Sequence, residues 1–111
     1  MLDIFKDDPL KNISIIHNGV ERKLQYRVVS RHEEYYGNYY VTKFYEGTIT
    51  HSYKKYLFFG KVIIKTEPKL IFTRYLNIES NEYTKKEIAN LLHLNLDKVD
   101  RKIEIEKGEI V

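Results

Sequence analysis

The strongest constraint on the fold is a series of strand-like runs separated by turns, which extends from residue 11 to residue 78. No apolar pattern with a helical period is sustained within this segment. Asn18-Gly19 stands between the first two runs, and Asn-Gly is the strongest short sequence signal for a two-residue β-hairpin. The sequence therefore predicts a mostly antiparallel sheet that opens with a hairpin at this turn.

The run after the turn alternates between apolar and polar residues, as a strand with one solvated face does. One face would carry Val20, Leu24, Tyr26 and Val28, and the other would carry Glu21, Lys23, Gln25 and Arg27. We expect three further strands over residues 38–46, 55–66 and 69–78. Glu67-Pro68 would separate the last two, because proline fixes its own backbone and disfavours helix in the residue before it. The strand over 55–66 is apolar on both faces, which predicts a central position.

The segment after the sheet predicts two short helices. Thr84 and Glu87 have the spacing of a capping box at the start of the first helix. Ala89 is the only alanine of the chain, and a small side chain is what a close approach of two helices requires. In this interpretation Ile88 and Leu92 face inward, His93 and Leu94 form the turn, Asn95 caps the second helix, and Val99 and Ile103 anchor it.

With this spacing, residues 84–111 resemble the helix-turn-helix segment of excisionase-like and MerR-like DNA-binding regulators. The resemblance implies that the second helix enters the major groove of double-stranded DNA. It implies DNA contacts from Asn95, Leu96, Lys98, Arg101 and Lys102, with Arg101 suited to reading guanine. Two short helices that only close a small α+β domain would use similar residues for packing, so this alternative stays open.

Together these features predict an α+β fold with a mostly antiparallel sheet of about five strands, followed by two short C-terminal helices in a helix-turn-helix arrangement. With 111 residues, the chain is expected to form a single domain over residues 1–111. Its sheet portion would cover residues 11–78 and its helix-turn-helix portion residues 84–111. The helix covering the sheet would begin near Thr84.

The amino-acid composition limits the classes of function that the chain can have. The chain has no cysteine, which excludes disulfides, thiolate metal sites and thiol catalysis. No apolar run approaches the roughly 20 residues needed to span a bilayer, and residues 1–8 lack the pattern of a signal peptide. We therefore expect a soluble, cytoplasmic protein with no membrane partner.

Residues 20–80 carry a net charge of +5 and residues 81–111 a net charge of −1. The sheet or a dimer partner would then have to supply much of any phosphate contact.

Eight of the ten tyrosines lie between residues 26 and 56, interleaved with lysine and arginine. Such a pattern is compatible with base stacking, with contact to a protein partner, or with plain packing of a half-buried sheet face. The segment Tyr35-Tyr36-Gly37-Asn38-Tyr39-Tyr40 is the least expected to be buried. Its partner-binding candidates are Tyr35, Tyr36, Tyr39 and Tyr40, because tyrosine adds contact area at low entropic cost.

Catalysis has little support in the sequence, so we expect a protein that is not an enzyme and has no cofactor. Its histidines, which are His17, His32, His51 and His93, lack metal-ligand spacing and are expected at the surface or in turns. The glycines stand singly, so there is no phosphate-binding glycine-rich loop.

The leading hypothesis is a small DNA-binding regulator or accessory factor in transcription regulation, which could act as a monomer or as a homodimer. The competing hypothesis is a protein-binding inhibitor or adaptor of a phage or mobile element that acts through its tyrosine-rich sheet. A third is a single-strand nucleic-acid binder that uses Tyr39 and Tyr40.

Overall fold

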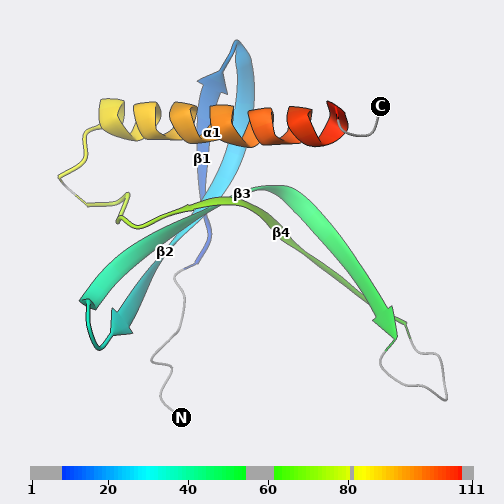
Figure 1. Cartoon of the computed structure of the whole chain (residues 1–111), viewed down its shortest axis with the longest axis horizontal. Coiled ribbons are helices and arrows are strands. Elements are labelled where there is room, and N and C mark those ends of the chain that lie inside the picture. The colour runs from blue at the N-terminus through cyan, green and yellow to red at the C-terminus, as the bar shows by residue number, and fades with distance from the viewer. Residues whose placement is uncertain (1–8, 55–61, 81, 109–111) are drawn as a thin grey trace.

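A computed structural model describes residues 9–54, 62–80 and 82–108. Within these residues four strands precede one helix: β1 (Lys11–His17), β2 (Val20–Glu33), β3 (Gly37–Lys54), β4 (Val62–Arg74) and α1 (Lys85–Gly108). The strands form one antiparallel sheet in the order β1-β2-β3-β4. Figure 1 shows α1 crossing the sheet and the β3–β4 ribbon running away from it toward the lower right. The prediction of a mixed α+β fold is confirmed, whereas five strands and two helices are wrong.

The hairpin between β1 and β2 forms where the sequence predicts it. Asn18 and Gly19 have φ values of 52° and 79°, and His17 pairs with Val20 across the turn. Positive φ at both central residues gives a turn whose twist matches that of the flanking strands. The predicted alternation also holds in the middle of β2, where Leu24 and Val28 are buried. Val20 is the exception, because it lies at the exposed end of the hairpin.

The two predicted strands on either side of Glu67-Pro68 are one strand. In β4, Pro68 lies opposite Thr48 of β3. Among the described residues β4 pairs only with β3, so Pro68 lies in an edge strand, where proline is tolerated because one side of the strand makes no ladder hydrogen bonds. The predicted central position is wrong for residues 62–66, which lie on this edge. Residues 55–61 lie outside the described residues.

Strand β3 continues beyond the end predicted at residue 46. The pairing of β3 with β4 shifts in register between Phe44 and Tyr45 and again between Tyr45 and Thr48. Gly47 has a φ of 69°, a conformation that glycine adopts without the clash a side chain would make. The strand therefore passes Gly47 through an irregularity instead of ending there.

The predicted helix-turn-helix is wrong, because residues 85–108 form one continuous helix. Ile88, Leu92 and Leu96 are spaced by four residues and lie on one helical face. Leu92 and Leu96 are fully buried. They belong to the first and the second predicted helix, so this stripe packs both segments against the sheet as a single helix. His93 and Leu94 lie within the helix, and Asn95 donates from Nδ2 to the carbonyl oxygen of Leu91 at 2.7 Å instead of capping a helix start.

The predicted capping box at the start of the helix is confirmed. The backbone N–H of Glu87 donates to Thr84 Oγ1 at 3.2 Å, and the backbone N–H of Thr84 donates to Glu87 Oε2 at 3.3 Å. These reciprocal bonds satisfy two backbone donors that a helix start leaves without intrahelical acceptors. The helix portion of the prediction thus begins correctly, while its residues 109–111 lie outside the described residues.

The core lies between α1 and one face of the sheet. It consists of Leu24, Val28, Phe44, Ile78, Leu92 and Leu96. The ring of Phe44 stacks on that of Phe72 with centroids 4.6 Å apart. Thr42 Oγ1 donates to the carbonyl oxygen of Leu76 at 2.6 Å and accepts from the N–H of Ile78 at 3.3 Å, which fixes the chain between sheet and helix. The described helix, α1, is not apolar enough along its length to cross a membrane.

Candidate functional site

Five tyrosines lie at one end of the sheet, and we call this end of the molecule the tyrosine end. Its members are Tyr35, Tyr36, Tyr39, Tyr40 and Tyr75. The first two lie in the turn between β2 and β3, the next two lie at the start of β3, and Tyr75 follows β4. Figure 1 shows this turn at the lower left, at the opposite end of β3 from the part that runs with β4 toward the lower right. The exposed fractions are 94% for Tyr35, 80% for Tyr36, 52% for Tyr40 and 80% for Tyr75.

Strand pairing fixes the position of the tyrosine end. Glu33 pairs with Gly37 and His32 with Asn38, so β2 and β3 are joined up to the turn. The His32 ring reinforces this pairing, because its Nδ1 lies 2.7 Å from Asn38 Oδ1. Tyr35 and Tyr36 are therefore carried by a short turn on a paired scaffold.

Tyr39, Tyr75 and Glu33 lie together at the tyrosine end. The rings of Tyr39 and Tyr75 have centroids 6.2 Å apart and are tilted by 45°. The Tyr39 hydroxyl donates to Glu33 Oε1 at 2.9 Å. This hydrogen bond raises the pKa of Tyr39 above its ordinary value of 10.0, because ionisation would remove the donor and place two negative charges side by side. Tyr39 therefore stays a hydrogen-bond donor at neutral pH.

These groups surround an open hollow of about 380 Å³, lined by Glu33, Tyr36, Tyr39 and Tyr75. Tyr36 and Tyr39 are two of the four partner-binding candidates predicted from the sequence, and the structure brings them together here. The sequence did not indicate Tyr75 or Glu33. Tyr75 is distant in the sequence from the tyrosine-rich segment, and only the return of β4 beside β3 places it there.

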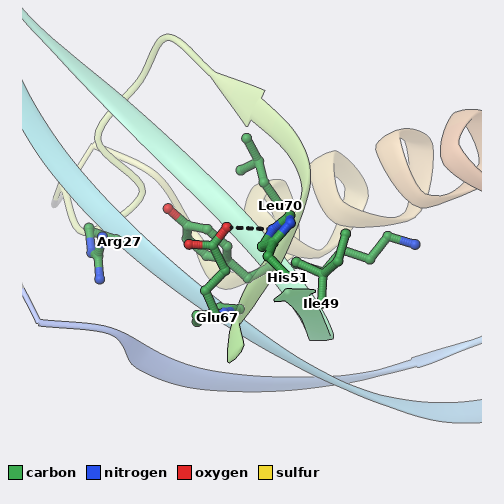
Figure 2. Close-up of a pocket in the computed structure, with 8 residues that line it drawn as sticks. Arg27, Ile49, His51, Glu67 and Leu70 are labelled. Atoms are coloured by element: carbon green, nitrogen blue, oxygen red, sulfur yellow. Dashed lines mark hydrogen bonds and ion pairs between the residues drawn. The ribbon is translucent and has the colours of Figure 1, made fainter. Parts of the chain in front are cut away.

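A second hollow, of about 450 Å³, lies at the irregularity of β3 (Figure 2). There His51 Nε2 lies 3.0 Å from Glu67 Oε1, and both side chains are about half exposed. The Arg27 guanidinium lies 5.8 Å from the centre of the Tyr45 ring. The lining residues include no serine, threonine or cysteine, so this histidine has no hydroxyl or thiol nucleophile beside it there.

The five residues predicted to contact DNA lie on different sides of α1. Leu96 is fully buried and Asn95 is 8% exposed, so these two face the sheet and not a DNA groove. Lys98, Arg101 and Lys102 are exposed. Spacings of three and four residues place them side by side on the helix surface, and we call them the basic edge.

Comparisons with protein family models, with curated proteins and with solved structures found no match.

Two acidic residues of α1 contact the sheet. Asp100 accepts from Arg22 Nη1 at 2.9 Å, while Arg22 Nε donates to Glu46 Oε2 at 2.9 Å. Asp97 Oδ1 lies 2.7 Å from Nε2 of His17. The contacts of Arg22, with Glu46 first, raise its pKa further above an already high value and keep it charged. Asp97 and Asp100, which contribute to the net negative charge of residues 81–111, therefore hold the helix against the sheet.

The burial of His17 shows that one prediction is wrong, because this histidine was expected at the surface or in a turn. It ends β1 and is only 3% exposed, with its ring centroid 5.3 Å from that of His93. Burial of His17 depends on α1 lying across the end of the hairpin, which no local sequence signal indicates.

Within the residues the structure describes, no three histidine or acidic side chains are placed to hold a metal ion.

Proposed function

We propose that this protein is a cytoplasmic, non-enzymatic protein-binding module, an adaptor or inhibitor, whose contact surface is the tyrosine end. The observation that carries the proposal is the gathering of four tyrosines, each at least half exposed, from two separate parts of the chain. Exposed aromatic clusters of this kind are uncommon on a surface that contacts only water. A phage or mobile element as the source belongs to the same proposal.

The chemistry of tyrosine suits this role. Its ring contributes apolar contact area, its hydroxyl bonds to polar groups, and it loses little conformational entropy on binding, which is why it is enriched in interface hot spots. The turn is short and held on both sides by paired strands. Such a preorganised surface lowers the entropic cost of association.

Site-specific photo-crosslinking tests the proposal. A benzoylphenylalanine at position 36, used in an extract of the source cells, should give a discrete protein adduct that excess wild-type protein suppresses. The Tyr36→Ala/Tyr40→Ala variant should fail to suppress it. The same crosslinker at position 86, an exposed lysine of α1, is the matched control and should give no such adduct.

The partner identified in this way should then be purified and its affinity measured by calorimetry. Binding should weaken by at least tenfold for the double tyrosine variant, in keeping with interface hot spots. It should also change little with salt, because a tyrosine-centred contact involves few net charges. Absence of a suppressible adduct, or equal affinity of the double variant for the purified partner, would overturn the proposal.

A second candidate function, DNA contact, is favoured by the basic edge. Lys98, Arg101 and Lys102 are exposed, while Asp97 and Asp100 are engaged with the sheet. In this candidate a regulator or accessory factor would contact the phosphate backbone of double-stranded DNA, as a monomer or a homodimer, without inserting a recognition helix. A random-sequence duplex measured by fluorescence anisotropy tests it.

For that candidate, affinity should fall steeply with salt, with a logarithmic slope of about −0.9 for each phosphate contacted. Lys98→Ala/Arg101→Ala should reduce both the affinity and the slope. Unchanged affinity would exclude the basic edge. A single-stranded oligonucleotide whose binding depends on Tyr39 and Tyr40, and not on residues 98–102, would instead support the single-strand hypothesis.

A further inference from the structure

The hollow at the tyrosine end combines aromatic rings with one carboxylate. Tyr36, Tyr39 and Tyr75 provide the rings, and Glu33 provides the negative charge. The face of an aromatic ring carries negative electrostatic potential, so a cation that lies over such a face is attracted to it. A carboxylate beside the rings adds both charge and hydrogen-bond acceptors.

We propose that this hollow is a receptor for an arginine side chain of the protein partner. This inference rests on the proposed function, and it names the chemical group that the tyrosine end recognises. The arginine guanidinium would lie against the rings of Tyr36 and Tyr75 and donate N–H groups to Glu33. Its planar shape allows both contacts at once, which a compact ammonium group does less well.

The hydrogen bond from Tyr39 prepares the carboxylate for this role. Because Tyr39 donates to Glu33 Oε1, the side chain of Glu33 is held beside the rings before a ligand arrives. A carboxylate already held in place costs less conformational entropy on binding than a freely rotating one. Neutral and anionic groups gain less here, because Glu33 presents a negative charge to the hollow.

Arg31 is a cation on the neighbouring strand, where it pairs with Tyr39 in the register. Its Nη1 donates to the carbonyl oxygen of Ser30 at 3.0 Å, and it is not one of the residues that line the hollow. The charge of Arg31 therefore acts on an incoming guanidinium from outside the hollow. The rings and Glu33 are the groups that would contact the ligand.

The experiment uses the full chain and two small probes that differ in charge and little in shape. Nα-acetyl-arginine amide is the cationic probe, and Nα-acetyl-citrulline amide is its neutral counterpart. In an NMR titration of the ¹⁵N-labelled protein, the arginine probe should shift the backbone amide signals of residues 33–39 and 75 in a saturable way. The citrulline probe should produce no saturable shift there.

Variants then test the separate contributions. Tyr75→Leu should weaken binding of the arginine probe about two- to fivefold, the effect of losing one exposed cation–π contact. Glu33→Gln keeps the shape of the side chain and should weaken binding by a similar factor or more. Glu82→Gln is the matched control for Glu33→Gln, because Glu82 is exposed, does not line the hollow and lies outside the tyrosine end, and it should bind like the wild type.

Equal binding of the two probes, or no saturable shift with the arginine probe, would overturn the inference. So would an effect of Glu82→Gln as large as that of Glu33→Gln. These outcomes are separate from the crosslinking result: a suppressible adduct at position 36 without arginine binding would leave the proposed function standing and remove only the arginine receptor. Tyr75 is 80% exposed, and circular dichroism of each variant confirms that it is folded.

Discussion

The guanidinium of Arg22 lies between Glu46 of β3 and Asp100 of α1, and its Nη1 donates to Asp100 Oδ2 at 2.9 Å. The two partners of this hydrogen bond are 78 positions apart in the sequence. Arg22 therefore links two strands and the helix through a single planar group. Its side chain is only 16% exposed, which makes the link better shielded from water than an ordinary surface ion pair.

Removal of this link should destabilise the fold. Arg22→Ala is expected to lower the free energy of unfolding by about 1 to 3 kcal/mol, because two carboxylates lose charged hydrogen bonds and part of this loss is screened by solvent. Urea denaturation of Arg22→Ala, with the exposed Lys98→Ala as control, measures the effect. Equal stability of these two variants would contradict a structural role for Arg22.

The burial of Leu96 distinguishes a helix packed along the sheet from a helix that reads DNA. Leu96→Ala should lower the free energy of unfolding by about 2 to 5 kcal/mol, because it leaves a cavity in the core. Leu94→Ala is the matched control, since Leu94 is 63% exposed and should change stability by no more than about 0.5 kcal/mol. Comparable losses in both variants would count against the burial described here.

The backbone at His93 provides a test of helix continuity. Within the middle of a helix, His93→Gly should be less stable than His93→Ala by about 1 kcal/mol, because glycine loses more backbone entropy on folding. In a turn with a left-handed residue at this position the order would be reversed. Thermal unfolding of the two variants therefore decides between one helix and two.

The stability of the protein should fall at high pH in part through Tyr39. Its pKa is raised in the folded state, so its contribution to stability is fully present below its ordinary pKa of 10.0 and is lost as the pH rises through the higher folded value. Tyr39→Phe should therefore lose less stability than the wild type over this alkaline range. Denaturant unfolding at several pH values measures the difference, with Tyr35→Phe as control. A parallel decline for all three proteins would refute this contribution.

Several features of the fold could be predicted because their cause lies within a few residues. Asn18-Gly19 specifies a tight turn through backbone conformation alone, and Thr84 with Glu87 caps the helix through bonds that span three positions. Tyr35 and Tyr36 were expected at the surface because a turn between strands leaves them little to pack against, and they are exposed. In the candidate site, the exposure of the tyrosine turn was therefore predictable, whereas the contact of Glu33 with Tyr39 across the same hairpin was not indicated by the sequence.

Other features required the tertiary structure. A proline often ends a strand, yet β4 continues through Pro68, and among the described residues β4 is an edge strand, the position in which a sheet tolerates proline. The turn predicted at His93 is wrong, because Ala89 and Asn95 fit one continuous helix as well as two short ones. The burial of Leu92 and Leu96 against Leu24 and Phe44 selects the continuous helix.

The sequence by itself determined the hairpin, the start of the helix and the exposure of the tyrosine turn, since these depend on local backbone preferences and local hydrogen bonds. Only the tertiary structure decided that the C-terminal segment is one helix, that Arg22 meets Asp100, and that Tyr75 joins Glu33 and Tyr39. The physical reason is that burial and ion pairing act between groups distant in the chain, and their positions follow from the packing of the sheet and helix as a whole.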